Sequence, residues 1–187
     1  FIKAAYKWCN DNGALLIIDE VQTGNGRTGE LYSYMHYDIK PDIVSTAKGL
    51  TGGLPLGATL IGEKAQDVLG FGDHGSTFGA NPVCCAAGVS ILKRIDSELL
   101  NSVKAKSKYV FDALKDAEGV EYLTGLGLMI GIKTKVPAAD VVKKCMESGV
   151  LCLTAKDKVR LLPALNIDEE TLEKAVNIIK SVCANQV

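Results

Sequence analysis

The sequence predicts an α/β domain followed by a smaller α+β domain. The run at residues 14–18 is short and uniformly apolar, which is typical of a strand buried on both faces of a mainly parallel sheet. A long helical pattern begins at residue 83, and short strands alternate with amphipathic helices beyond it. We therefore expect part of a large α/β domain, a connecting helix and a small α+β domain at residues 1–80, 81–100 and 101–187.

The first part of the chain is expected to hold one helix and three strands, at residues 1–12, 14–18, 42–46 and 58–62. Gly13 suits the end of the helix. The first strand ends on Asp19 and Glu20, and glycines make residues 22–29 an irregular loop. Lys48 follows the second strand closely and precedes a glycine-rich stretch, so two charged side chains are expected at strand ends.

The second part is expected to hold four helices and four strands. The helices are predicted at residues 83–95, 101–117, 138–148 and 168–184, and the strands at residues 120–123, 128–132, 150–153 and 159–162. Pro82 suits a first helical turn, since it has no N–H to satisfy there. Asp168 is a good N-cap for the last helix because its carboxylate can accept the free N–H groups of the first turn.

Composition and charge exclude several classes of function. The formal net charge is -1, from 22 acidic and 21 basic residues that are scattered along the chain, so no field attracts nucleic acid or an anionic membrane. No apolar run has the length of a membrane span, and residues 1–8 lack the apolar core of a signal peptide. We therefore expect a soluble, cytoplasmic protein with no nucleic-acid or membrane partner.

The six cysteines and two histidines do not form a metal-binding pattern. No cysteine pair has the CxxC spacing that most structural zinc sites use. Cys84 and Cys85 are adjacent in an apolar stretch, where a free cysteine usually behaves as a small core residue. We expect no metal site and reduced, structural thiols.

Asp19 and Lys48 are the candidate chemical residues. Taken singly, Asp19 is more often a turn cap and Lys48 more often a surface lysine. Both, however, follow strands of one predicted sheet, at the carboxyl ends where open α/β sheets bind ligands. A pyridoxal cofactor needs this pair, because a lysine amine bonds to it and a carboxylate keeps its ring nitrogen protonated.

Three motifs resemble those of the class III aminotransferases. They are Ile17-Ile18-Asp19-Glu20-Val21-Gln22-Thr23-Gly24-Asn25-Gly26-Arg27-Thr28-Gly29, Lys40-Pro41-Asp42 and Thr46-Ala47-Lys48-Gly49-Leu50. The stretches at residues 30–37 and 159–167 are most similar to the acetylornithine branch of that family. The resemblance covers essentially the whole chain. It implies a pyridoxal-phosphate transferase of fold type I, present here as part of the large domain plus the small domain.

The resemblance also implies a role for individual residues. Asp19 would pair with the pyridine nitrogen of pyridoxal 5'-phosphate, Val21 would pack on the ring, and Gln22 would reach the phenolic oxygen. Lys48 would hold the cofactor covalently and then move the proton at the substrate α-position. Thr77 would bind the cofactor phosphate of the neighbouring subunit in a homodimer.

Arg160 resembles the arginine that grips the substrate α-carboxylate, a task that suits a planar guanidinium. Without the resemblance, an arginine in a strand would more often belong to a structural ion pair.

The implied reaction moves an amino group from N-acetylornithine to 2-oxoglutarate, a step of arginine biosynthesis. Ornithine, 4-aminobutyrate and succinyl-diaminopimelate stay open as donors, and so do a racemase, an aminomutase and a non-catalytic truncated copy. The resemblance implies that the family's chains are roughly twice as long as this one, and we expect the missing part to lie upstream. We expect the isolated chain to have little or no activity and to associate through uncovered apolar surface.

Overall fold

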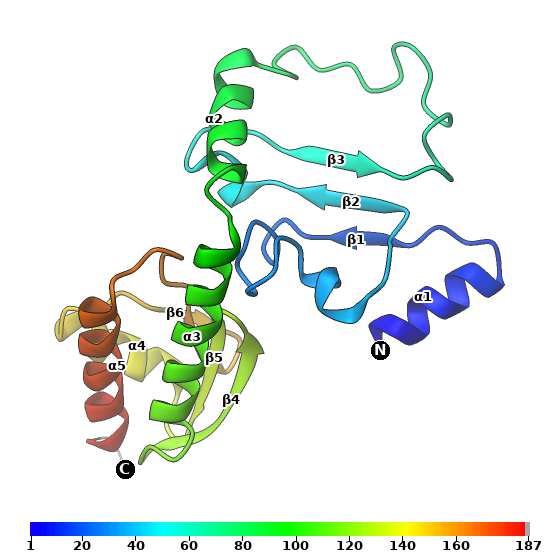
Figure 1. Ribbon diagram of the computed structural model, residues 1–187. Coiled ribbons are helices and arrows are strands. Elements are labelled where there is room, and N and C mark those ends of the chain that lie inside the picture. Colours follow the sequence, from blue (N-terminus) through cyan, green and yellow to red (C-terminus); the bar gives the residue numbers. More distant parts are fainter. Residues whose placement is uncertain (186–187) are drawn as a thin grey trace. The chain divides into compact units, whose positions relative to one another are not determined.

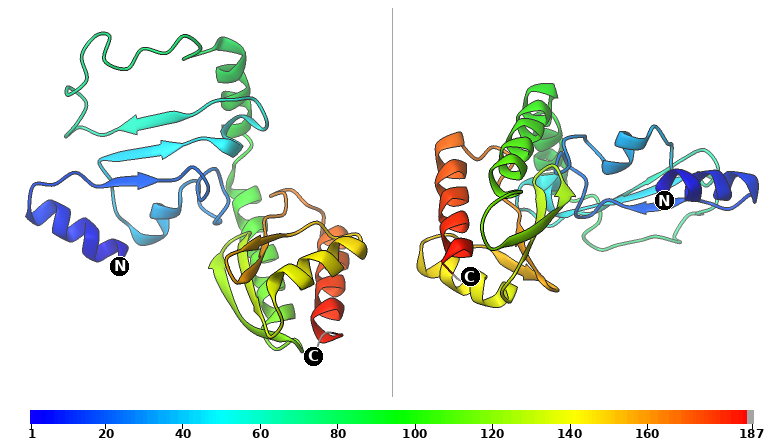
Figure 2. Two further views of the ribbon diagram at one scale, coloured as in Figure 1. Left: turned by 180° about the vertical axis from the view of Figure 1, so that it is seen from behind. Right: turned by 90° about the horizontal axis from the view of Figure 1, so that it is seen from below.

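The computed structural model describes residues 1–185, which form two compact units: Phe1–Ser97, and a second unit that begins at Glu98. Figures 1 and 2 show that each unit has its own sheet. The first unit contains α1 (Ile2–Asp11), β1 (Ile17–Asp19), the 3-10 helix η1 (Ser33–Tyr37), β2 (Ile43–Thr46), the 3-10 helix η2 (Lys48–Thr51), β3 (Ala58–Ile61) and α2 (Pro82–Leu92). The second contains α3 (Ser97–Leu114), which begins at the boundary, and then β4 (Val120–Leu126), β5 (Met129–Thr134), α4 (Ala138–Glu147), β6 (Leu153–Ala155), β7 (Lys158–Leu161) and α5 (Glu169–Ala184).

The sheet of the first unit is mixed and has the order β1-β2-β3 (Figure 1). Strands β1 and β2 are parallel, with Asp19 opposite Ser45, whereas β2 and β3 are antiparallel. Two details of the first predicted strand were wrong. It begins at Ile17, and it is not buried on both faces, since Ile17 is 61% exposed and Leu15 is also exposed. Burial alternates along this segment, with Leu16 buried, Ile18 half-buried and Ile17 exposed, so only one face is covered among the described residues.

Asp42 joins the segments that lead into β1 and β2. Its carboxylate accepts a hydrogen bond from the Leu16 N–H at 2.8 Å and forms an ion pair with Lys64 at 3.0 Å. The Asp42 N–H in turn donates to the Leu16 carbonyl at 2.9 Å. The bond from the Leu16 N–H, aided by Lys64, lowers the pKa of Asp42 below its usual value. This buried carboxylate therefore fixes where the two parallel strands start.

Replacing Asp42 with alanine is expected to lower the free energy of unfolding by about 1–3 kcal/mol, because the buried Leu16 N–H loses its side-chain acceptor. The folded-state pKa lies below the unfolded value of about 3.9, so the stabilisation from ionised Asp42 is fully present well above that value. It is lost as the pH falls through the lower, folded-state pKa. Urea denaturation of both proteins from pH 7 down to about pH 3 should show the difference shrinking only at the acid end. A constant difference would contradict this assignment.

The second unit is a four-stranded antiparallel sheet of order β4-β5-β7-β6 with α3, α4 and α5 packed against it (Figures 1 and 2). Along β5 the buried residues alternate, with Ile130 and Ile132 facing the helices, as expected for a sheet covered on one face. The predicted N-cap of α5 is confirmed, because Asp168 accepts a hydrogen bond from the Thr171 N–H at 2.7 Å. The pKa of Asp168 is lowered by that bond.

One predicted strand of this unit starts later than expected. The sequence placed it at residues 150–153, whereas β6 begins at Leu153. The Val150 N–H donates to the Cys145 carbonyl at 2.8 Å, so residue 150 closes the end of α4 and is not available to a strand. Residues that look extended and apolar in the sequence are here part of a helix terminus.

Most of the cysteines are core residues, whereas Cys9 and Cys85 are only half-buried. All six are free thiols, and Cys84, Cys145, Cys152 and Cys183 are buried. Burial raises the pKa of Cys183 to about 11, so this thiol is neutral at physiological pH. Among the helices of residues 1–185, none combines the length and the apolar character that crossing a membrane requires.

Candidate active site

Asp19 lies at the carboxyl end of β1 with its side chain exposed. Its Oδ1 accepts hydrogen bonds from the Val21 N–H at 2.9 Å and from the Ser45 hydroxyl at 3.3 Å. The Glu20 N–H donates to the Ser45 carbonyl at 2.8 Å, which continues the parallel ladder. The carboxylate is therefore held in a fixed orientation by backbone and side-chain donors, yet open to a ligand.

Lys48 follows β2 and opens η2, and its side chain is exposed. Its backbone is left-handed, with φ at 47°, a conformation that costs a residue with a Cβ about 1–2 kcal/mol. Such strain persists only where the surroundings enforce it, and it often marks a functional position. Because β1 and β2 are parallel, their carboxyl ends share one edge of the sheet. The structure thus brings Asp19 and Lys48 to the same edge, as the sequence predicted.

Helix α2 supports the turn that carries Lys48. Gly88 lies against this turn: a Cβ there would be 3.7 Å from the Leu50 carbonyl oxygen and from the Thr51 side chain. Leu50 and Thr51 are both buried. Asn81 caps α2 by accepting the N–H groups of the first turn, and Pro82 lies in that turn, as the sequence predicted. The turn after Lys48 is therefore packed from one side by a capped helix.

Glu20 organises the loop that follows Asp19. Its side chain is completely buried, and its carboxylate accepts hydrogen bonds from the Thr23 hydroxyl, from the Ser33 hydroxyl at 2.6 Å and from the Tyr34 N–H at 3.0 Å. These bonds tie the start of the loop to its end, which satisfies a carboxylate that would otherwise be costly to bury.

Val21 and Gln22 lie within this Glu20-anchored loop, directly after Asp19. Val21 is half-buried and Gln22 is exposed. Both residues follow Asp19 directly in the chain, at the carboxyl end of β1. The sequence placed these two residues in the site only through the family resemblance, and the structure adds that a buried carboxylate anchors the segment on which they lie.

Two further residues of this region were not singled out from the sequence. Asn25 and Thr46 are buried, and the Asn25 amide donates to the Thr46 hydroxyl at 3.1 Å and to the Ala47 carbonyl at 3.0 Å. Thr46 also shares a hydrogen bond with Tyr32, whose pKa is raised by burial. For the buried Glu20, the only signal in the sequence was its position next to Asp19 at the end of a predicted strand. No local signal points to Asn25, because its partners lie far along the chain.

Thr77 is exposed and lies in the segment between β3 and α2, which has no helix or strand. The same segment carries Val68, Phe71 and Phe78, which are large, apolar and exposed. The structure does not bring Thr77 into hydrogen-bond contact with Asp19 or Lys48 among the described residues.

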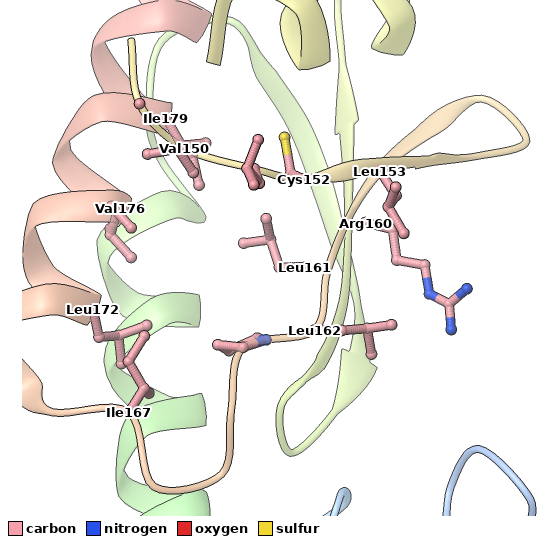
Figure 3. Close-up of a pocket in the computed structure, with 14 residues that line it drawn as sticks. Val150, Cys152, Leu153, Arg160, Leu161, Leu162, Ile167, Leu172, Val176 and Ile179 are labelled. Atoms are coloured by element: carbon pink, nitrogen blue, oxygen red, sulfur yellow. The ribbon is translucent and has the colours of Figure 1, made fainter. Parts of the chain in front are cut away.

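Arg160 belongs to the second unit, where it lies on β7 opposite Gly131 of β5 and Leu153 of β6. It borders an apolar pocket of about 320 Å³ lined by side chains of β6, β7 and α5, among them Leu161, Leu172 and Val176. Figure 3 shows the Arg160 guanidinium pointing away from these aliphatic side chains. The half-buried arginine thus has an aliphatic stem at the pocket rim and a charged end directed elsewhere.

Comparison with known proteins identifies the family. The model of the family described as aminotransferase class-III matches residues 1–183. The chain belongs to this family. A curated relative, acetylornithine aminotransferase of Haemophilus ducreyi, is 47% identical to this class III chain over 184 residues. That match covers 97% of the chain and 47% of the relative, so the chain spans about half the length of the curated relatives it matches.

Solved structures agree with the α/β class and with a partial fold-type I transferase domain. Acetylornithine aminotransferase from Elizabethkingia anophelis superimposes on the class III chain with a TM-score of 0.89 at 31% identity, covering 98% of this chain and 49% of that one. Ornithine aminotransferase from Toxoplasma gondii, crystallized in the presence of oxidized glutathione and with partial occupancy of PLP at its active site, gives a TM-score of 0.90 at 31% identity. It covers 98% of this chain and 46% of that one.

Proposed function

We propose that the protein containing this chain is a pyridoxal-phosphate-dependent transaminase that moves an amino group from N-acetylornithine to 2-oxoglutarate. The observation that carries the proposal is the placement of Lys48, in a left-handed backbone conformation, at the same sheet edge as Asp19. The 47% identity to an acetylornithine aminotransferase supports the choice of donor, and arginine biosynthesis is the pathway that this donor implies.

The residues at the sheet edge fit pyridoxal phosphate. An exposed amine and an exposed, oriented carboxylate lie on one edge, and the cofactor presents an electrophilic carbon and a basic ring nitrogen to such groups. When bound, pyridoxal phosphate supplies an aldehyde that reacts with amines and a ring that withdraws electrons from the substrate α-carbon. Asp19, Val21, Gln22 and Lys48 are the residues that would hold it within this unit.

Each of these residues has a physical task in the proposed reaction. Asp19 keeps a proton on the ring nitrogen by offering a full negative charge whose Oδ1 is already fixed by Val21 and Ser45. Val21 offers an apolar surface to one ring face, and Gln22 donates to the phenolic oxygen. Lys48 would attach the cofactor through Nζ and, once its amine is free, would move the proton between the substrate α-carbon and the cofactor.

Arg160 and Thr77 complete the proposal. Arg160 binds the substrate α-carboxylate through two parallel N–H donors. Thr77 donates to the cofactor phosphate of a second subunit in a homodimer. Val68, Phe71 and Phe78 of the same segment are large, apolar and exposed, and exposed apolar side chains of this kind are compatible with an interface. The cytoplasm is the proposed compartment.

The activity test is an amino-transfer assay on the full-length protein. Glutamate formed from 2-oxoglutarate is measured with N-acetylornithine, ornithine, 4-aminobutyrate and succinyl-diaminopimelate as donors. We expect kcat/KM to be at least about tenfold higher for N-acetylornithine, because binding sites tuned to one donor's distal group commonly discriminate by that much. A preference for ornithine would reassign the donor, and no glutamate from any donor would refute the transaminase proposal.

A further inference from the structure

Asn25 connects the loop after Asp19 to the two residues that precede Lys48. Its side chain is only 6% exposed. The amide nitrogen donates to the Thr46 hydroxyl at 3.1 Å and to the Ala47 carbonyl at 3.0 Å. These partners lie 21 and 22 residues further along the chain. One side chain thus bridges two segments that each carry a proposed cofactor residue.

The hydrogen bond to Ala47 acts on the backbone of Lys48. The Ala47 carbonyl belongs to the peptide group whose nitrogen is that of Lys48, so fixing this oxygen fixes the plane from which the Lys48 φ is measured. Ala47 has φ at -164° and ψ at -142°, and Lys48 has φ at 47°. The Ala47 carbonyl also accepts the Leu50 N–H at 3.0 Å. Two donors therefore hold the peptide group that makes Lys48 left-handed.

Asn25 is costly to the fold at this position. Its own backbone is left-handed, with φ at 55°, which asparagine tolerates better than most residues. Its Oδ1 is buried and has no hydrogen-bond partner within the part of the chain that the structure describes. An apolar side chain would avoid that desolvation cost. The two bonds that its amide donates are therefore its distinguishing contribution, and both go to the approach to Lys48.

We propose that Asn25 is a positioning residue for Lys48. Its amide holds the Ala47 carbonyl, and through it the left-handed backbone that aims the Lys48 side chain along the sheet edge. Asn25 touches neither cofactor nor substrate in this role. The inference rests on the proposed function, in which Lys48 is the lysine that attaches pyridoxal phosphate.

The test compares Asn25→Gly with the parent in the full-length protein. Glycine keeps the left-handed backbone available and removes the whole side chain, including the amide. Asp38→Gly is the matched control. Asp38 also has a left-handed backbone, with φ at 52°, and its side chain is exposed. The readouts are the apparent Kd for pyridoxal phosphate, the pH midpoint of the visible absorbance of the lysine-bound cofactor, and Tm.

We expect Asn25→Gly to weaken cofactor binding about tenfold, the size of one lost hydrogen bond that aims a reactive group, and to shift the pH midpoint. Asp38→Gly should change neither. If Asn25→Gly does not fold, Asn25→Asp serves instead, since it keeps the volume and the left-handed tolerance but replaces the donor by an acceptor.

Lowered Tm with unchanged Kd and unchanged pH midpoint would overturn the proposal and leave Asn25 a purely structural residue. The result is separable from failure of the proposed function. If borohydride fixes no cofactor on Lys48 of the folded parent, Lys48 is not the cofactor lysine and both proposals fall. If the parent is labelled at Lys48 and Asn25→Gly behaves like the parent, only the positioning role is refuted.

Discussion

Lys48→Ala in the full-length protein is expected to abolish amino transfer, with kcat falling by about 10⁴- to 10⁶-fold, the range seen when a covalent catalyst is removed. The physical reason is that, in the proposed reaction, one amine both attaches the cofactor and moves the α-proton. Borohydride trapping with pyridoxal phosphate, followed by peptide mapping, should give one phosphopyridoxyl label on the Lys48 peptide of the parent and none on that of the variant.

Lys40→Ala is the matched control, because Lys40 is another exposed lysine of the first unit. It should keep both the label at residue 48 and the parent's activity. Selective labelling of another lysine in the parent, or activity retained by Lys48→Ala within tenfold, would contradict the assignment of Lys48.

Gly119→Ala is expected to lower the free energy of unfolding by about 2–5 kcal/mol, from overpacking combined with a left-handed backbone. Gly119 has φ at 80°, and a Cβ there would lie 2.1 Å from the Cys183 carbonyl oxygen of α5. The atoms that this Cβ would meet are all backbone atoms of Cys183. The Gly119 carbonyl also accepts a hydrogen bond from the Lys135 N–H at 3.0 Å. The turn before β4 therefore cannot move away without losing its own hydrogen bond.

Gly149→Ala separates the two causes of this loss. Gly149 is also left-handed, with φ at 89°, but a Cβ there would meet no atom within 4 Å. Its alanine variant should cost only the backbone strain, about 1–2 kcal/mol. Urea denaturation of the two variants measures the difference directly. Equal losses would show that the close approach of Gly119 to α5 is not a rigid feature of the fold.

Elements whose signals are local were predictable from the sequence. The cap of α5 by Asp168 was predictable because an N-cap contacts only the residues that directly follow it. Strand β2 ends just before Lys48, as the residue pattern indicates. Burial was less predictable, as Leu15 and Ile17 show, since exposure depends on which segments cover a strand. The start of β6 was missed because Val150 is recruited by the end of α4.

The site was predictable only in part, and for the same reason. Asp19 and Lys48 are conspicuous because both follow strands, and parallel pairing then brings them to one edge. Glu20 bonds to Ser33 and Tyr34, which lie 13 and 14 residues further along the chain. Asn25 bonds to Thr46 and Ala47, which lie 21 and 22 residues further along. No periodicity or spacing rule indicates such contacts. They emerge only when the loop closes onto the strand.

At residue 48, the side chain that the proposed catalysis requires and the residue that would give the highest stability are different, because the backbone there is left-handed. Glycine would adopt φ of 47° without the roughly 1–2 kcal/mol that a Cβ costs there. A search for stabilising substitutions guided by backbone geometry alone would therefore recommend replacing the one amine that the proposed chemistry requires. The same geometry tells a protein engineer where not to optimise: a more heat-resistant version of this protein must gain its stability elsewhere and keep the strain at residue 48.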